Sequence, residues 1–276
     1  MISFCVGTGR CGTTFFAKLA ALEPHVAASH ERLRLPATFH MFCKWHGIPV
    51  DPEGFLSDRE AAIRDDLRAH RVSFEASALL SHSLLELHER FAARFLLLVR
   101  HPVHTVGSFA VRGWFVEPIP WRDPALPPTI REGVEPRHFF GRNLPRGEEF
   151  ARWTRLSQIG RIAWFWQARN RGILDQFREL PASDVRIARL EDLDFEHYAA
   201  LAPFLGWTPT IDRAQFAALA ASRPNAGAPV SYDWDARARE ELEAEVAPLA
   251  SALGYDLHGS TRTAVPRVEQ VLAALT

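Results

Sequence analysis

Short apolar runs, separated by stretches with a helical pattern, dominate the hydrophobic profile of this chain. Ile2–Val6, Arg71–Ser77 and Arg94–Pro102 are predicted to be buried strands, and Val185–Leu193 is a further strand candidate. The third run, "RFLLLVRHP", begins almost continuously apolar, as expected for a central strand that is covered on both faces. The pattern therefore indicates a parallel sheet.

Amphipathic stretches with a helical period lie between and after these runs. They predict helices over Thr13–Leu22, Glu148–Leu180 and Asp235–Leu253. Strands that alternate with helices are typical of an α/β fold, in which helices flank a central parallel sheet. At 276 residues the chain is expected to form a single domain, residues 1–276.

One segment interrupts the alternation. Trp114–Gly147 is rich in proline and carries several aromatic and arginine residues, so neither regular helix nor strand is predicted there. A long loop in a compact domain often covers a binding site. We interpret residues 114–147 as a lid or an acceptor-binding segment.

Composition and charge narrow the function classes. The net charge of −1 argues against broad electrostatic binding of nucleic acid or of an anionic membrane. The chain has no apolar run long enough to span a membrane and no pattern of a secretory signal, so a cytoplasmic location is expected. Its three cysteines show no spacing typical of metal ligands, which fits a reducing compartment. Nothing in the pattern specifies an oligomeric state.

The first candidate site follows the first predicted strand. In "GTGRCGTT", four residues separate Gly7 from Gly12, and two threonines follow at the start of a predicted helix. A glycine turn between strand and helix presents free N–H groups and a partial positive charge to an anion. Thr13 occupies the position at which a nucleotide hydrolase or kinase carries Lys, which counts against those enzymes. The residues expected to contact the anion are Gly9, Arg10, Cys11, Gly12, Thr13 and Thr14.

A second candidate site follows the strand at Arg94–Pro102. Arg100 comes directly after the apolar run and Ser108 lies two helical turns later, so a guanidinium and a hydroxyl could grip a second phosphate. Because the carboxyl ends of parallel strands share one edge, this pair and the glycine loop are expected to line one crevice. Cys11 lies near a helix N-terminus, where a thiol pKa can be lowered, but we interpret it as a small loop residue.

Together the two motifs resemble those of the sulfotransferases that use 3′-phosphoadenosine 5′-phosphosulfate (PAPS). "GTGRCGTTFF" is similar to the phosphosulfate loop of that family, and "LLVRHPVHTVGSF" to its 3′-phosphate motif. "LEPHVAASHERLRLP" is similar to a stretch of the tyrosylprotein, carbohydrate and bacterial members. The resemblance implies a P-loop NTPase-like sulfotransferase fold, PAPS as co-substrate and transfer without a metal.

The resemblance also implies roles for individual residues. Arg10 stands in the place of the loop Lys or Arg, Phe15 could flank the adenine, and Arg100 with Ser108 would hold the 3′-phosphate. Glu31 falls on the general base that removes the proton of the acceptor hydroxyl. The acceptor is expected to be a carbohydrate, a phenol or a small natural product.

Other assignments stay open. Glu75, His30 and His82 are alternative bases. In "SRPNAGAPVSYDW", which resembles the late loop that closes over the nucleotide, Arg223 would contact the 3′-phosphate or ribose. Leu190 replaces a tyrosine that relatives often have. The alternative functions are a P-loop nucleotide kinase and a nucleotide-binding protein without catalysis.

Overall fold

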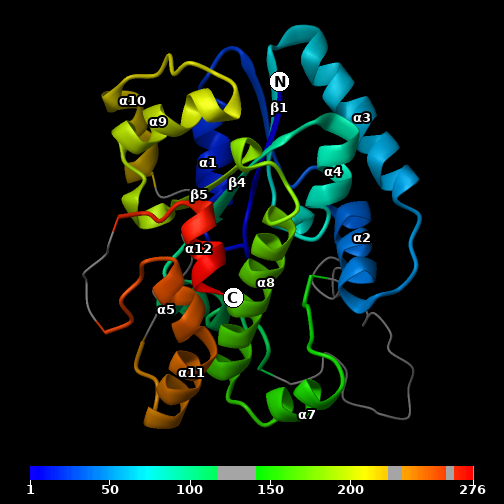
Figure 1. The fold of residues 1–276 in the computed structure, drawn as a ribbon. Coiled ribbons are helices and arrows are strands. Elements are labelled where there is room, and N and C mark those ends of the chain that lie inside the picture. Colours follow the sequence, from blue (N-terminus) through cyan, green and yellow to red (C-terminus); the bar gives the residue numbers. More distant parts are fainter. Residues whose placement is uncertain (117–140, 223–231, 259–263, 276) are drawn as a thin grey trace.

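A computed structural model of the chain describes residues 1–116, 141–222, 232–258 and 264–275. Its centre is a five-stranded sheet in the order β2-β3-β1-β4-β5, in which every neighbouring pair is parallel (Figure 1). The strands are β1 Ile2–Val6, β2 Val26–His30, β3 Val72–Ala76, β4 Arg94–Val99 and β5 Val185–Arg189. All five carboxyl ends therefore meet at one edge.

Alternate residues of the central strands face two separate hydrophobic cores. In β4, Phe95, Leu97 and Val99 belong to one core, whereas Leu96 and Leu98 belong to the other. This alternation follows from the two-residue period of a strand. It explains why the sequence of β4 is apolar without interruption, because both of its faces are buried.

Helices cover both faces of the sheet (Figure 1). The core that contains Leu96 and Leu98 is closed by α1 Thr13–Ala20, α9 Phe195–Leu205 and α10 Arg213–Ala221. The other core is closed by a larger set of helices: α2 Arg34–His46, α3 Pro52–Ala69, α4 Leu84–Phe91, α5 Pro102–Ala110, α7 Glu148–Thr154, α8 Gln158–Phe177, α11 Ala236–Ala252 and α12 Val268–Ala274.

Side-chain caps define where several helices begin. The carboxylates of Asp51, Asp194, Asp212 and Asp235 accept hydrogen bonds from backbone N–H groups in the first turns of α3, α9, α10 and α11. Such caps satisfy donors that have no partner within the helix. Short 3₁₀ turns follow or precede strands at Ala78–Leu80, Ala182–Asp184 and Leu190–Asp192.

The predicted α/β architecture is confirmed, and two predicted segments are corrected. The long helix predicted over Glu148–Leu180 is two helices, because Ser157 interrupts the pattern and caps α8 by accepting from Gly160 N. The predicted strand Val185–Leu193 ends at Arg189 and continues as a 3₁₀ turn. The Pro-rich segment 114–147 lies largely outside the described residues. Within the described part of the chain, no helix is long and apolar enough to cross a membrane.

Candidate functional site

The glycine loop occupies the carboxyl edge of the sheet between β1 and α1. Gly9, Arg10 and Gly12 all have positive φ angles, of 81°, 55° and 102°. Gly7 is required for a different reason: a Cβ atom there would lie 2.5 Å from the Leu98 carbonyl oxygen of β4 and 2.6 Å from Cys11 Sγ. The loop is therefore packed tightly against the neighbouring strand.

The N-terminus of α1 begins directly at this loop. Gly12 is the N-cap residue and has no side chain with which to cap the helix, and the first turn carries Thr13 and Thr14 but no acid. The first intrahelical bond runs from Phe16 N to Gly12 O, so the preceding N–H groups lack helical partners. An open, partly positive helix end is suited to an oxyanion.

The hydroxyls of Thr13 and Thr14 meet at one nitrogen atom. His30, the last residue of β2, places its Nε2 atom 3.3 Å from Thr13 Oγ1 and 3.2 Å from Thr14 Oγ1. Burial lowers the pKa of His30, and the nearby charge of Glu31 opposes that effect. This shift favours the neutral form of the imidazole.

The second motif meets the loop directly. Arg10 Nε donates to Ser108 Oγ at 3.0 Å, and Arg100 Nη1 donates to the Arg10 carbonyl oxygen at 3.2 Å. Ser108 lies on α5 and is 7% exposed. The structure thus brings Arg10 together with Arg100 and Ser108, from which it is 90 and 98 residues distant in the sequence.

Positive charge is concentrated around Arg10. Its pKa is lowered to about 10, first by burial and then by repulsion from Arg112 and Arg100, whereas Glu31 acts in the opposite direction. Arg10 remains charged at neutral pH. Like charges that gather beside an open helix end favour an anionic ligand. Sequence reasoning missed Arg112, which lies in the turn that follows α5.

The strand end that carries Arg100 is fixed by two other elements. The His101 N–H donates to Glu191 Oε1 at 2.8 Å, and Tyr255 OH donates to Glu191 Oε2 at 3.0 Å. Trp166 Nε1 of α8 donates to the Arg100 carbonyl at 3.2 Å. Glu191 was not identified from the sequence, because the residues it joins are distant along the chain.

Glu31 directly follows β2, a strand that the sequence analysis did not predict. Val26–His30 forms an edge strand whose small residues gave no alternating pattern. Glu31 itself has φ of 49°, and its N–H donates to the Ala76 carbonyl of β3. Its side chain is 23% exposed and lies 3.8 Å from Arg34 Nε. A carboxylate is therefore available at the rim of the site.

Glu75, the second candidate base, is held in a buried ion pair. It is 3% exposed, and its Oε2 accepts from Arg59 while its Oε1 accepts from Arg32 N at 3.0 Å. Burial raises the pKa of Glu75, and the charge of Arg59 opposes that rise. Glu75 therefore joins Arg59 to the turn that follows Glu31.

His82, another alternative base, lies in a packed environment. Its ring packs against Trp45, with centroids 5.0 Å apart, and close to Gly172 of α8. Burial lowers the pKa of His82 to about 3, and the charge of Arg169 adds to that effect. A histidine this weakly basic in a packed position is a poor general base near pH 7.

The two phenylalanines after the loop have different environments. Phe16 is fully buried between Phe74 and Tyr198, so it is a core residue. Phe15 is only partly buried and meets Phe216 edge to face at 6.0 Å. Leu190 packs over Gly12, with Cδ1 2.5 Å from the position that a Cβ atom would take. Phe15 and Leu190 thus place apolar surface beside the loop.

Cys11 does not have the lowered thiol pKa that a position near a helix N-terminus can produce. Cys11 is fully buried, and burial raises its thiol pKa despite hydrogen bonds from the loop backbone. It is therefore a packing residue, as interpreted, and not a thiolate. Cys5, Cys11 and Cys43 are all free. In the described ranges, no group of three or more His, Cys, Asp or Glu residues is arranged to hold a metal ion.

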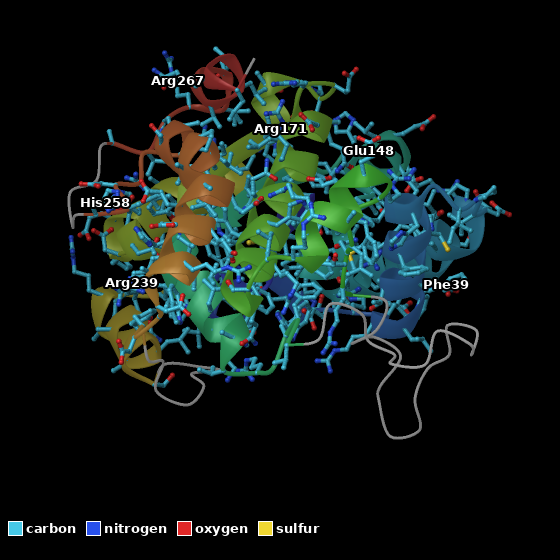
Figure 2. All side chains as sticks on the ribbon, turned by 90° about the horizontal axis from the view of Figure 1, so that it is seen from below. Phe39, Glu148, Arg171, Arg239, His258 and Arg267 are labelled. Carbon is cyan, nitrogen blue, oxygen red and sulfur yellow. The ribbon has the colours of Figure 1, made fainter. Side chains whose placement is uncertain are left out.

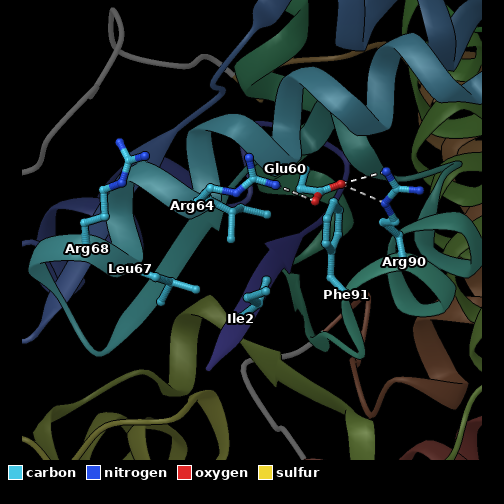
Figure 3. Close-up of a pocket in the computed structure, with 8 residues that line it drawn as sticks. Ile2, Glu60, Arg64, Leu67, Arg68, Arg90 and Phe91 are labelled. Carbon is cyan, nitrogen blue, oxygen red and sulfur yellow. Dashed lines mark hydrogen bonds and ion pairs between the residues drawn. The ribbon is translucent and has the colours of Figure 1, made fainter.

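Two further features lie outside this site. Arg223 belongs to residues 223–231, beyond the described part of the chain. A surface pocket lies between α3, α4 and the start of β1, and Figure 3 shows Glu60 bonded to Arg64 and Arg90 at its rim. Ile2 lines this pocket, so it lies at the amino edge of the sheet, opposite the glycine loop.

Comparison with known proteins identifies the fold. No protein-family model matches the sequence, and no curated protein is similar enough in sequence to count as a match. The sulfotransferase domain of the Synechococcus PCC 7002 olefin synthase is similar in structure, with a TM-score of 0.52 at 16% identity over 93% of this chain and 95% of that domain. The chain therefore has the fold of sulfotransferase domains, as its motifs predicted.

A second solved structure, the sulfotransferase domain from the curacin biosynthetic pathway, is more distant. Its TM-score is 0.46 at 15% identity, over 93% of this chain and 98% of that one. At such identities, likeness extends to the fold and leaves the reaction to be argued from the site.

Proposed function

We propose that this protein transfers a sulfuryl group from PAPS to an acceptor hydroxyl. The observation that carries the proposal is the contact between Arg10 and Ser108, 3.0 Å from Nε to Oγ, which joins the two anion-binding motifs at one edge of a sulfotransferase-like sheet. A donor with phosphate groups on both the 3′ and the 5′ oxygens of its ribose would need two such motifs side by side.

The loop is the proposed site of the 5′-phosphosulfate. The N–H groups at the start of α1 and the hydroxyls of Thr13 and Thr14 would bind its oxygens. Arg100 and Ser108 would hold the 3′-phosphate, and Phe15 with Leu190 would offer apolar surface to the adenine. Arg10 would neutralise the negative charge that develops on the leaving phosphate. Arg223, in the late loop, is a further proposed contact of the 3′-phosphate or ribose.

Glu31 is the proposed general base. The acceptor oxygen would form the new S–O bond while its proton passes to the Glu31 carboxylate. The bond between sulfur and the bridging oxygen would break, leaving its electron pair on the phosphate of adenosine 3′,5′-bisphosphate. This assignment is supported by the position of Glu31 at the carboxyl edge, where its charge acts on Arg10, and by its partial exposure.

The acceptor would approach along α2, which begins three residues after Glu31. Leu35 and Phe39, one helical turn apart, are 52% and 48% exposed on this helix. Figure 2 shows Phe39 at the outer side of α2. Such surface favours an acceptor with an apolar portion, such as a phenol or a small natural product, over a wholly polar sugar.

Thermal unfolding with added nucleotides tests the proposal. We expect adenosine 3′,5′-bisphosphate to raise the melting temperature of the protein and ATP with Mg²⁺ to have little effect, because Lys is absent at position 13. The reverse preference would indicate a kinase. Release of labelled sulfate from PAPS into water, and transfer to a panel of hydroxyl compounds, separate an enzyme from a binding protein that lacks turnover.

A further inference from the structure

One ring nitrogen of His30 contacts two hydroxyls at the end of the glycine loop. Its Nε2 atom is 3.3 Å from Thr13 Oγ1 and 3.2 Å from Thr14 Oγ1, and both threonines belong to the first turn of α1. Thr13 is buried, and Thr14 and His30 are partly buried. These contacts join β2 to the loop beside the proposed base.

The direction of these hydrogen bonds depends on the tautomer of His30. A threonine hydroxyl has one proton to donate, and a neutral imidazole donates from one ring nitrogen and accepts at the other. If Nε2 carries the proton, it donates to the hydroxyl oxygens, and both hydroxyl protons can point at a ligand. If Nε2 is bare, it accepts a hydroxyl proton, and lone pairs face the loop instead.

An oxyanion in the loop therefore favours one tautomer only. It accepts hydrogen bonds and repels lone pairs, so it needs both hydroxyls as donors. We propose that His30 is a positioning residue for the donor: its Nε2–H group holds the hydroxyls of Thr13 and Thr14 so that both donate to a tetrahedral phosphate or sulfate group. This inference rests on the proposed function of the loop as an oxyanion site.

The role differs from that of a general base. A base must present a bare nitrogen to the acceptor hydroxyl, whereas Nε2 of His30 is directed at the donor side of the site. Glu31, the next residue, adopts a positive φ angle, so it leaves the line of the strand. Neighbouring residues thus serve opposite sides of the reaction, with His30 on the donor side and Glu31 on the acceptor side.

Three variants at position 30 test the proposal through binding of adenosine 3′,5′-bisphosphate, measured by calorimetry. His30→Leu should weaken binding about tenfold, since one to two modest hydrogen bonds are misdirected. His30→Gln, whose amide nitrogen can occupy the place of Nε2, should restore affinity to within about threefold. His30→Asn, which carries its amide nearer the backbone, should behave like Leu. Urea unfolding of each variant checks that it is folded.

A double-mutant cycle with the threonines separates positioning from general stability. In the Thr13→Val/Thr14→Val background, His30→Leu should cause no further loss of affinity, because no hydroxyl remains to be oriented. ¹⁵N NMR of labelled histidine adds a direct readout: saturation with the bisphosphate should leave Nε2 protonated. A bare Nε2 in that complex, or equal affinity in wild type and His30→Leu, would overturn the inference.

Inorganic sulfate serves as a second probe in the same experiments. If the wild-type protein binds sulfate but not the bisphosphate, the proposed donor is wrong. The affinity of the His30 variants for sulfate then tests the role of His30. If neither anion binds the wild type, both the proposed function and the role of His30 are refuted. If both bind and His30→Leu changes neither affinity, the role of His30 alone is refuted.

Discussion

Glu75 Oε1 accepts the backbone N–H of Arg32 over 3.0 Å, so a buried carboxylate of β3 holds the residue that directly follows Glu31. The other Glu75 oxygen is bonded to Arg59, and the Arg32 side chain reaches Asp66 at 2.7 Å. These bonds stabilise a turn in which Glu31 has a left-handed backbone. The two carboxylates therefore differ in environment: Glu31 is partly exposed, and Glu75 is buried and holds the turn beside it.

We expect Glu31→Gln to lower kcat by about 10²–10⁴-fold and to leave affinity for adenosine 3′,5′-bisphosphate nearly unchanged. The amide keeps the size of the side chain but cannot accept the proton of the acceptor hydroxyl. Single-turnover transfer from labelled PAPS measures the chemical step, and calorimetry measures the affinity.

Glu75→Gln is the matched control for that variant, since Gln retains an oxygen for the Arg32 N–H. We expect it to cost stability and to reduce kcat less than Glu31→Gln does. If Glu75→Gln abolishes turnover in the folded protein while Glu31→Gln retains it, the base has been assigned to the wrong carboxylate.

Removing Arg59 should destabilise the protein, because it leaves a buried carboxylate without its ion-pair partner. Arg59 is fully buried and its guanidinium lies 4.9 Å from the Phe55 ring, so Arg59→Met keeps much of the packing. It removes the cation that is bonded to Glu75, and we expect a loss of about 3–5 kcal/mol in unfolding free energy near pH 7. Arg59→Met/Glu75→Gln should recover part of this loss.

The loss of unfolding free energy in Arg59→Met should depend on pH. Burial raises the pKa of Glu75, and removing Arg59 raises it further. Above the pKa of the unfolded state, the folded variant then binds more protons than the unfolded chain, so its stability falls as the pH rises toward the folded pKa. Relative to wild type, the variant should be less impaired at pH 5 than at pH 7, by urea unfolding. An equal deficit at both values would mean that Glu75 does not carry the effect.

The loop and its partner motif could be predicted because their signals are local. A glycine turn between a strand and a helix, and a strand ending in Arg100, each lie within a short stretch of sequence. Their convergence followed from the rule that parallel strands share a carboxyl edge, and the contact of Arg10 with Ser108 agrees with it.

The contacts that hold the turn at Glu31 could not be predicted in this way. The strand that carries His30 reads "VAASH", in which two alanines give neither a strand nor a helix pattern. Arg59 lies on an amphipathic helix, where an arginine is usually exposed, and only the fold turns it toward Glu75. Contacts between distant elements depend on helix rotation and on register, which local patterns do not specify.

Gly7→Ala should disrupt the loop more than the small size of the added methyl group suggests. The added Cβ would lie 2.5 Å from the Leu98 carbonyl oxygen, a backbone atom of a central strand that cannot move alone. We expect a loss of about 1–3 kcal/mol from overpacking, with weaker binding of adenosine 3′,5′-bisphosphate.

Gly54→Ala provides the control for Gly7→Ala. Gly54 lies within α3, and an added Cβ there would have nothing within 4 Å. Alanine should stabilise that helix by about 0.5–1 kcal/mol. Equal stability changes in the two variants, measured by thermal unfolding, would contradict the tight fit at Gly7.

Arg100→Ala should reduce the preference for a 3′-phosphorylated donor. Loss of a charge-assisted contact costs about 2–3 kcal/mol, so affinity for adenosine 3′,5′-bisphosphate should fall by tens to hundreds of fold. Affinity for adenosine 5′-phosphosulfate, which lacks the 3′-phosphate, should change much less. Arg171→Ala, which removes an arginine from a surface ion pair of α8 with Asp175, is the control. If both nucleotides weaken equally, Arg100 acts only by supporting the loop through the Arg10 carbonyl.

Arg10→Ala should affect the liganded and unliganded proteins differently. In the free protein, loss of the bond to Ser108 costs about 0.5–1.5 kcal/mol, but repulsion from Arg100 and Arg112 is relieved at the same time. We therefore expect a small change in melting temperature without ligand and a clearly smaller rise on addition of adenosine 3′,5′-bisphosphate. Turnover should fall as well, because the charge of Arg10 would act on the donor both before and during transfer. Arg10→Lys should retain part of both effects. A large loss of stability in the free protein, together with an unchanged ligand-induced rise, would make Arg10 a structural residue and remove it from the donor site.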